Sequence, residues 1–225
     1  MRATLIEFIS AFSALLPAII FLFRFPKTPD EKLLWVVFFY LLLSFFSDVL
    51  TIWNITPGNF TTLQNTIFTI FEFLMFITYL SLSLKNKFIV KLSSVVAFCY
   101  TVFASFYILL NKKKHEDYYT LVTTIENVII ITLCVIVLYN FIKTPQILFI
   151  YSYSQFWIVI GILFYLAGTF FLSLVLKELP NQEQEKYWIL NLFSNILKNI
   201  FFTIAFLMKK NTLTNQSSIK SQYYI

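Results

Sequence analysis

WILNLFSNILKNIFFTIAFLMKK, residues 188 to 210, is an almost wholly apolar stretch that carries one lysine, Lys198, close to its middle. A helix needs about 20 apolar residues to cross the hydrocarbon core of a bilayer, which is about 30 Å thick. A charged side chain at mid-bilayer costs about 3 kcal/mol on insertion scales, so it indicates a functional site or an ion-pair partner. The stretch predicts a membrane-spanning helix in which Lys198 needs an explanation.

The composition of the whole chain places it among membrane proteins. Of its 225 residues, 59% are hydrophobic and 12% are charged, and the mean hydropathy is +0.77. Soluble globular domains do not have this composition. The chain contains three glycines and no glycine-rich phosphate-binding motif, so the sequence does not support nucleotide binding. Its lysines lie in short loops rather than on one basic face interleaved with aromatic residues, which argues against a nucleic-acid partner.

Apolar runs of the required length predict seven membrane-spanning helices. They lie at residues 4 to 23, 33 to 53, 61 to 84, 88 to 110, 118 to 141, 153 to 176 and 187 to 208. The connections are short and rich in Pro, Asn, Lys and Glu, which end helices and favour water. We therefore expect an all-α, polytopic seven-helix bundle as one domain over residues 1 to 208. A polar and flexible tail is expected over residues 209 to 225.

The distribution of basic residues between the loops predicts the orientation. One side carries ten of them: Arg24, Lys27, Lys32, Lys85, Lys87, Lys91, Lys143, Lys209, Lys210 and Lys220. The other side carries six: Arg2, Lys112, Lys113, Lys114, Lys177 and Lys186. Because loops rich in Lys and Arg stay in the cytoplasm, we expect the N-terminus outside and the C-terminus inside.

Charged residues also lie within the apolar segments. Apart from lysines close to segment ends, they are Glu7, Asp48, Glu72, Glu126 and Lys198. Four acids and one base cannot all pair, so some carboxyl groups must be protonated, hydrated or hydrogen-bonded to neutral groups. At 1.5 Å per helical residue, Glu72 and Lys198 both lie about 16 Å from the predicted outer surface.

Neutral polar residues accompany these charges on the same helix faces. Asn191, Asn195 and Lys198 follow an i, i+4, i+7 pattern, and Asn65 lies seven residues before Glu72. Such stripes must face the bundle interior, because lipid cannot satisfy polar groups. We predict a ligand-binding pocket that opens to the outside and is closed beneath. Its residues are Asp48, Asn65, Glu72, Glu126, Asn127, Asn191, Asn195, Lys198 and Asn199. The competing interpretation is a Lys198 to Glu72 pair that only locks three helices together.

Three stretches carry a resemblance to a known group of proteins. They are NTIFTIFEFLMFITYL around Glu72, FWIVIGILFYLAGTFFLSLV at residues 156 to 175, and WILNLFSNILKNIFFTIAF around Lys198. In these stretches the chain resembles uncharacterised bacterial seven-helix integral membrane proteins. The resemblance implies a multi-pass protein of the bacterial inner membrane, and it implies no activity.

Four functions fit these patterns. The first is a sensor or receptor that binds a small ligand from outside and signals to a cytoplasmic or membrane protein partner. The second is a proton-coupled small-molecule transporter, for which carboxyl groups and a lysine near the midplane are typical. Against transport, Pro17 is the only proline well inside a segment, and no internal repeat is evident.

The third function is an intramembrane enzyme that uses Asp48 and Glu72 as general acid and base on a lipid, but no second catalytic motif supports it. The fourth is a rhodopsin-like protein with Lys198 as the retinal Schiff base and Glu72 as the counterion, although Ser194 replaces the acid expected one turn before the lysine. We expect no metal or cofactor, because Cys99 and Cys134 lie in apolar segments and His115 lies in a loop without ligand-spaced partners.

Overall fold

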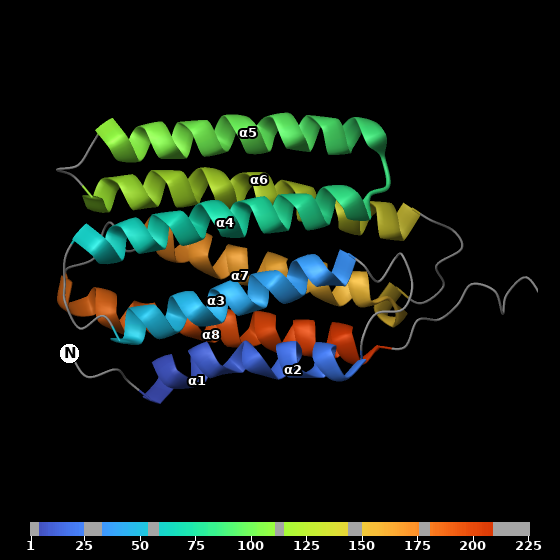
Figure 1. Ribbon diagram of the computed structural model, residues 1–225, viewed down its shortest axis with the longest axis horizontal. Coiled ribbons are helices and arrows are strands. Elements are labelled where there is room, and N and C mark those ends of the chain that lie inside the picture. The colour runs from blue at the N-terminus through green and yellow to red at the C-terminus, as the bar shows by residue number, and fades with distance from the viewer. Residues whose placement is uncertain are drawn as a thin grey trace, which may run out of the picture.

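The computed structural model describes residues 5–24, 33–53, 59–110, 115–143, 150–175 and 181–208. All regular elements in these ranges are helical (Figure 1). In chain order they are α1 (Leu5–Ser13), α2 (Leu15–Arg24), α3 (Leu34–Trp53), α4 (Asn59–Ser83), α5 (Lys87–Leu110), α6 (His115–Lys143), the short 3-10 helix η2 (Ile150–Ser152), α7 (Ser154–Val175) and α8 (Asn181–Leu207). The predicted tail, residues 209 to 225, lies outside the described residues.

The prediction of seven spans is confirmed for the described ranges. When α1 and α2 are taken as one span, 7 helices are long and apolar enough to cross a membrane. Large apolar side chains cover the outside of the bundle: Phe88 is 72% exposed and Phe98 is 70% exposed. A soluble surface rarely carries apolar patches of this extent. The described helices are therefore compatible with a multi-pass membrane protein.

Two helices begin three or more residues earlier than the sequence predicts. Helix α6 begins at His115 instead of residue 118, and α8 begins at Asn181 instead of residue 187. His115 is therefore a helical residue, and its expected place in a loop is wrong. Counting apolar residues finds only the part of a helix that lies in hydrocarbon, whereas backbone hydrogen bonding can continue into the polar region. Acidic residues such as Glu116 and Glu183 follow both starts in the sequence, which is typical of helix N-termini.

The first span is broken, although the sequence predicts one continuous helix over residues 4 to 23. Helix α1 ends at Ser13 and α2 begins at Leu15. Pro17 explains the break, because its ring nitrogen cannot donate the helical hydrogen bond to the Ser13 carbonyl. At the break, the Ala14 amide bonds to the Ala11 carbonyl (3.4 Å), and the Ser13 hydroxyl donates to the Ser10 carbonyl (2.6 Å). The break thus leaves serine side chains at mid-span.

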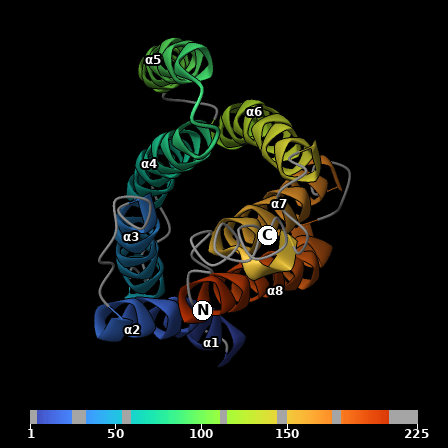
Figure 2. The same cartoon turned by 90° about the vertical axis from the view of Figure 1, so that its right-hand side faces the viewer.

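The spans form a closed ring, except for α5. Around the bundle, α3, α4, α6, α7, α8 and the α1–α2 span each contact the next, and α5 lies outside the ring, mainly against α4 (Figure 2). Helices α7 and α8 make the most extensive contact. Two glycines permit their approach: a Cβ at Gly161 would lie 3.1 Å from the Cβ of Phe201, and one at Gly168 would lie 2.2 Å from Ser194 Oγ. Small residues at helix interfaces have this role in membrane proteins.

An aromatic cluster lies at one end of the ring, between α2, α3 and α8. At the end where α2 finishes and α3 begins, Phe21 stacks on Phe38 with ring centroids 4.8 Å apart and contacts Phe206 at 5.1 Å. Arg24 donates a hydrogen bond to the Phe206 carbonyl, which satisfies one of the last carbonyls of α8. This aromatic end is the predicted cytoplasmic side. The polar side chains of the interior lie between this cluster and the opposite end.

Candidate functional site

Lys198 lies at the centre of the ring and is fully enclosed. Its side chain is 0% exposed, and its amine donates a hydrogen bond to the Tyr40 hydroxyl at 2.5 Å. The same nitrogen lies 4.7 Å from the ring centroid of Tyr40 and 4.1 Å from that of Tyr165. A cation at such distances from aromatic rings is stabilised by their quadrupoles, and more so where water is excluded. Two tyrosines therefore form an aromatic cage around the lysine.

Glu72 joins the cage through hydroxyl groups. The Tyr40 hydroxyl donates to Glu72 Oε1 at 2.7 Å, and the Tyr165 hydroxyl donates to Oε2 at 3.5 Å. Within the described residues, Tyr40 therefore connects the amine of Lys198 to the carboxyl of Glu72, where the sequence suggests a direct ion pair. Helices α3, α4, α7 and α8 each contribute one side chain to this contact. Charge-assisted hydrogen bonds of this kind are short and strong.

The polar stripe on α8 bonds to the broken first span. Asn195 Nδ2 donates to Ser10 Oγ at 3.0 Å, and Asn199 Nδ2 donates to Ser13 Oγ at 2.7 Å. The Asn195 side chain also lies within hydrogen-bonding reach of the Asp48 carboxyl on α3. The serines next to the break near Pro17 are thus the hydrogen-bond partners of the asparagines beside Lys198.

Helix α6 brings a second carboxyl group close to the cage. Glu126 is 1% exposed and lies close enough to Glu72 for their charges to interact. Its neighbour Asn127 is also 1% exposed, and Asn127 Oδ1 accepts a hydrogen bond from Thr169 Oγ1 on α7 at 3.5 Å. Two acids and one lysine are therefore buried in the same part of the bundle.

We call this set the polar network. It comprises Ser10 and Ser13 of α1, Tyr40 and Asp48 of α3, Glu72 of α4, Thr123, Glu126 and Asn127 of α6, Tyr165 and Thr169 of α7, and Asn191, Asn195, Lys198 and Asn199 of α8. Every member of the ring contributes to it, and α5 contributes none of these side chains. The network therefore lies inside the ring, together with part of the apolar core.

Several atoms of the polar network are buried without a hydrogen bond from the described protein groups. They are Asp48 Oδ2, Thr123 Oγ1, Glu126 Oε1, Asn127 Nδ2, Asn191 Oδ1 and Asn199 Oδ1. A buried polar atom without a partner costs about 1 to 3 kcal/mol. Because such atoms are rare in folded proteins, each calls for an explanation such as water, an ion or a ligand.

The structure gathers eight of the nine predicted site residues. Glu72, Glu126, Asn127, Lys198 and Asn199 are buried, and Asp48, Asn191 and Asn195 are partly buried in the polar network. Asn65 is partly buried two turns before Glu72, and its backbone carbonyl accepts a hydrogen bond from Thr69 at 2.9 Å. Its side chain neither bonds to the described residues nor contributes a buried unpaired atom, unlike that of Asn191, so Asn65 stays outside the network.

The sequence interpretation overlooks the hydroxyl groups of the network. Tyr40 and Tyr165 are two of 13 tyrosines, and nothing in their local sequence separates them from tyrosines at the membrane interface. Their depth carries a usable signal. Tyr40 lies 13 residues from the outer end of α3 at Trp53, which is about 20 Å and close to the depth of Lys198.

Comparisons with known proteins give no relative from which a function could be transferred. No protein-family model, curated protein or solved structure matches the chain. The class that the described residues define is an all-helical bundle with seven candidate membrane-spanning helices and a polar network in its interior.

Proposed function

We propose that the protein is a membrane sensor that binds a small polar ligand within the polar network. The observation that carries the proposal is the group of unpaired polar atoms around the Lys198 cage, six of which belong to the network. A purely structural lock would satisfy its own polar groups, since unsatisfied ones destabilise the fold. A ligand-binding site, in contrast, contains polar groups whose hydrogen bonds form only when the ligand binds.

The unpaired atoms also favour one chemistry of ligand. Asp48 Oδ2, Glu126 Oε1, Asn191 Oδ1 and Asn199 Oδ1 can only accept hydrogen bonds while the carboxyl groups are ionised, and Asn127 Nδ2 is the sole pure donor among the six. The carboxyl groups of Asp48, Glu72 and Glu126 also outnumber the single amine of Lys198. A ligand that brings N–H donors and positive charge complements both features. The proposed class is a small amine, either cationic or zwitterionic.

Signalling would follow from a change in helix packing. A ligand shifts a conformational equilibrium only when it binds one packing more tightly than the other. The polar network joins every helix of the ring, so a molecule bound there contacts groups on several helices at once. The connections between spans are too short in the sequence to hold an output domain. We therefore assign the output to a cytoplasmic or membrane partner that contacts the basic loops.

The test is the thermal stability of purified protein across a panel of small amines, amino acids and carboxylic acids. An amine should raise the melting temperature of the wild type in proportion to its concentration, and this rise should disappear in Glu126→Gln. Thr132→Val is the matched control, because Thr132 lies exposed on the same helix and, among the described residues, its hydroxyl bonds only to the Val128 carbonyl. A panel in which no compound shifts the wild type, or shifts Glu126→Gln equally, argues against the proposal.

Proton-coupled transport is the second candidate, and the break between α1 and α2 favours it. Discontinuous helices that expose polar groups near a midplane site are typical of transporters. Here the break places Ser10 and Ser13 against Asn195 and Asn199. Liposomes with an internal pH indicator separate the two functions. Amine-dependent proton flux identifies a transporter, whereas binding without flux identifies a sensor.

A further inference from the structure

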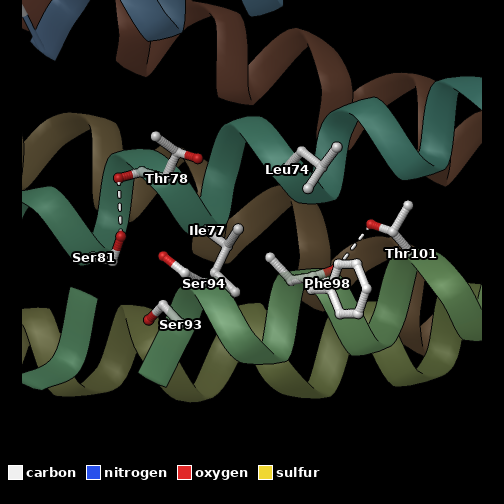
Figure 3. Close-up of a pocket in the computed structure, with 9 residues that line it drawn as sticks. Leu74, Ile77, Thr78, Ser81, Ser93, Ser94, Phe98 and Thr101 are labelled. Carbon is white, nitrogen blue, oxygen red and sulfur yellow. Dashed lines mark hydrogen bonds between the residues drawn. The ribbon is translucent and has the colours of Figure 1, made fainter. Parts of the chain in front are cut away.

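A cavity of about 350 Å³ lies between α4 and α5 (Figure 3). It borders α5, which packs outside the ring (Figure 2). None of the nine predicted site residues lines it. Its wall combines apolar side chains, including Leu74, Ile77 and Phe98, with the hydroxyl groups of several serines and threonines. Phe98 is exposed at the rim, so the cavity opens toward the lipid side of the bundle.

One hydroxyl group in the cavity lacks a partner. Ser93 is only 6% exposed and lines the cavity, and its hydroxyl makes no hydrogen bond to the described residues. The neighbouring Ser94 and Thr101 hydroxyls instead donate to carbonyls four residues earlier, at 2.9 Å and 2.8 Å. Serine and threonine in membrane helices usually bond to their own backbone in this way. Ser93 is therefore available to donate to a molecule in the cavity.

Positive charge lies on α5 beside the cavity. Lys87, Lys91, Ser94, Phe98 and Thr101 are spaced i, i+4, i+7, i+11 and i+14 along α5, so they share one helix face. The last three line the cavity, and both lysines are exposed. The sequence holds no acidic residue between Glu72 and Glu116. The face of α5 that lines the cavity thus continues, toward the start of this helix, to two lysines that form its basic end.

We infer that this cavity binds one anionic phospholipid. The phosphate contacts Lys87 and Lys91 at the basic end, Ser93 donates a hydrogen bond to a phosphate or ester oxygen, and an acyl chain covers Leu74 and Phe98. Basic residues beside membrane helices attract anionic lipids in this manner. The apolar wall has no role in binding free phosphate, so it favours a lipid as the source of the phosphate group.

The test compares lipids on the purified full chain in uncharged detergent. Native mass spectrometry measures binding of phosphatidylglycerol, of phosphatidylcholine with identical acyl chains, and of inorganic phosphate as a competitor. We expect phosphatidylglycerol to bind at least tenfold more tightly than phosphatidylcholine. Each lysine accounts for about a fivefold change in affinity, so Lys87→Gln with Lys91→Gln should reduce phosphatidylglycerol binding by more than tenfold.

Two further variants test whether lipid binding depends on the lysines and the serine at this cavity. Lys143→Gln removes an exposed lysine on α6 at the same end of the bundle, and it should leave binding unchanged. Ser93→Ala should weaken binding severalfold and keep the preference for the anionic lipid. Equal binding of the two lipids overturns the inference. So does an unaffected double lysine variant, an equal loss in Lys143→Gln, or displacement of the lipid by inorganic phosphate.

Discussion

The Lys198 amine and the Tyr40 hydroxyl lie 2.5 Å apart in the middle of the bundle, and the same hydroxyl donates to Glu72 at 2.7 Å. One oxygen atom therefore accepts a hydrogen bond from a buried lysine and donates one to a buried carboxyl group. Tyr40 is 1% exposed, so water at the surface cannot easily replace it. The stability of the charged cage depends on this hydroxyl.

Removing the hydroxyl alone should destabilise the protein strongly. Tyr40→Phe keeps the ring over Lys198 but leaves both charged groups with one hydrogen bond fewer, which costs about 2 to 4 kcal/mol. Tyr165→Phe is the matched control, because its hydroxyl lies 3.5 Å from Glu72, and it should cost less than about 1 kcal/mol. Equilibrium unfolding in mixed micelles measures both values. Equal losses in the two variants contradict the bridging role of Tyr40.

Lys198 and Glu72 should be energetically coupled although Tyr40 lies between them. Lys198→Met or Glu72→Gln alone leaves a partner charge buried, at a cost of about 3 to 5 kcal/mol. The double variant removes both charges, so its loss should be smaller than the sum of the single losses by about 1 to 3 kcal/mol. A double-mutant cycle of unfolding free energies gives this coupling. Strict additivity indicates that the two groups do not act together.

Glu126 should have the opposite effect on stability. Its Oε1 is buried without a hydrogen-bond partner among the described residues, so this oxygen makes no stabilising contact with them. Glu126→Gln replaces the carboxyl group with an amide of nearly the same volume, and we expect a protein at least as stable as the wild type. Stability retained together with a lost ligand response is the signature of a functional residue. A loss above about 1 kcal/mol in the absence of ligand indicates a structural role instead.

The close approach of α7 and α8 should depend on Gly168. An alanine there places its Cβ 2.2 Å from Ser194 Oγ and 3.0 Å from Ser194 Cβ. The helices must separate, and overpacking of this kind costs about 1 to 3 kcal/mol. Ser194→Gly should recover part of the loss in the double variant, and thermal melting of the three proteins shows whether it does. A stable Gly168→Ala protein with unaltered melting contradicts the observed packing.

Most of the fold could be predicted from hydrophobicity, because lipid imposes a simple requirement of length and polarity on each span. The helix ends could not be placed as well, since apolar runs stop short of the helical starts at His115 and Asn181. The break at Ala14 also escaped prediction. A proline in the first turn of a helix is well tolerated, and Pro17 alone does not reveal that a second helix begins at Leu15.

The charged residues of the site could be predicted from the sequence, whereas its tyrosines could not. Lys198, Glu72 and Glu126 are conspicuous in apolar segments, and the structure places all three in one buried region. Tyr40 and Tyr165 are chemically ordinary in a chain rich in aromatic residues. Their role depends on how α3 and α7 are rotated about the helix axes. For α7, the packing of Gly161 and Gly168 against α8 helps to set this rotation.

The central proposal, that a ligand binds in the polar network, requires that solutes reach this network, and the sequence predicts that they do so from outside. The direct measurement is modification of single cysteines by a membrane-impermeant, charged thiol reagent in right-side-out vesicles. The background is Cys99→Ser with Cys134→Ala, because these are the free cysteines of the described chain. Asn195→Cys probes the network, and Phe193→Cys, at a position 61% exposed on the lipid side of α8, is the control.

Thiols react as thiolates, which form in water and not in lipid. The account predicts that Asn195→Cys reacts from outside at least tenfold faster than Phe193→Cys, and that a stabilising amine slows the reaction. If Asn195→Cys reacts only in inside-out vesicles, the network opens to the other side and the predicted access from outside is wrong. If it is as unreactive as Phe193→Cys, the network is a closed lock, and the central proposal is contradicted.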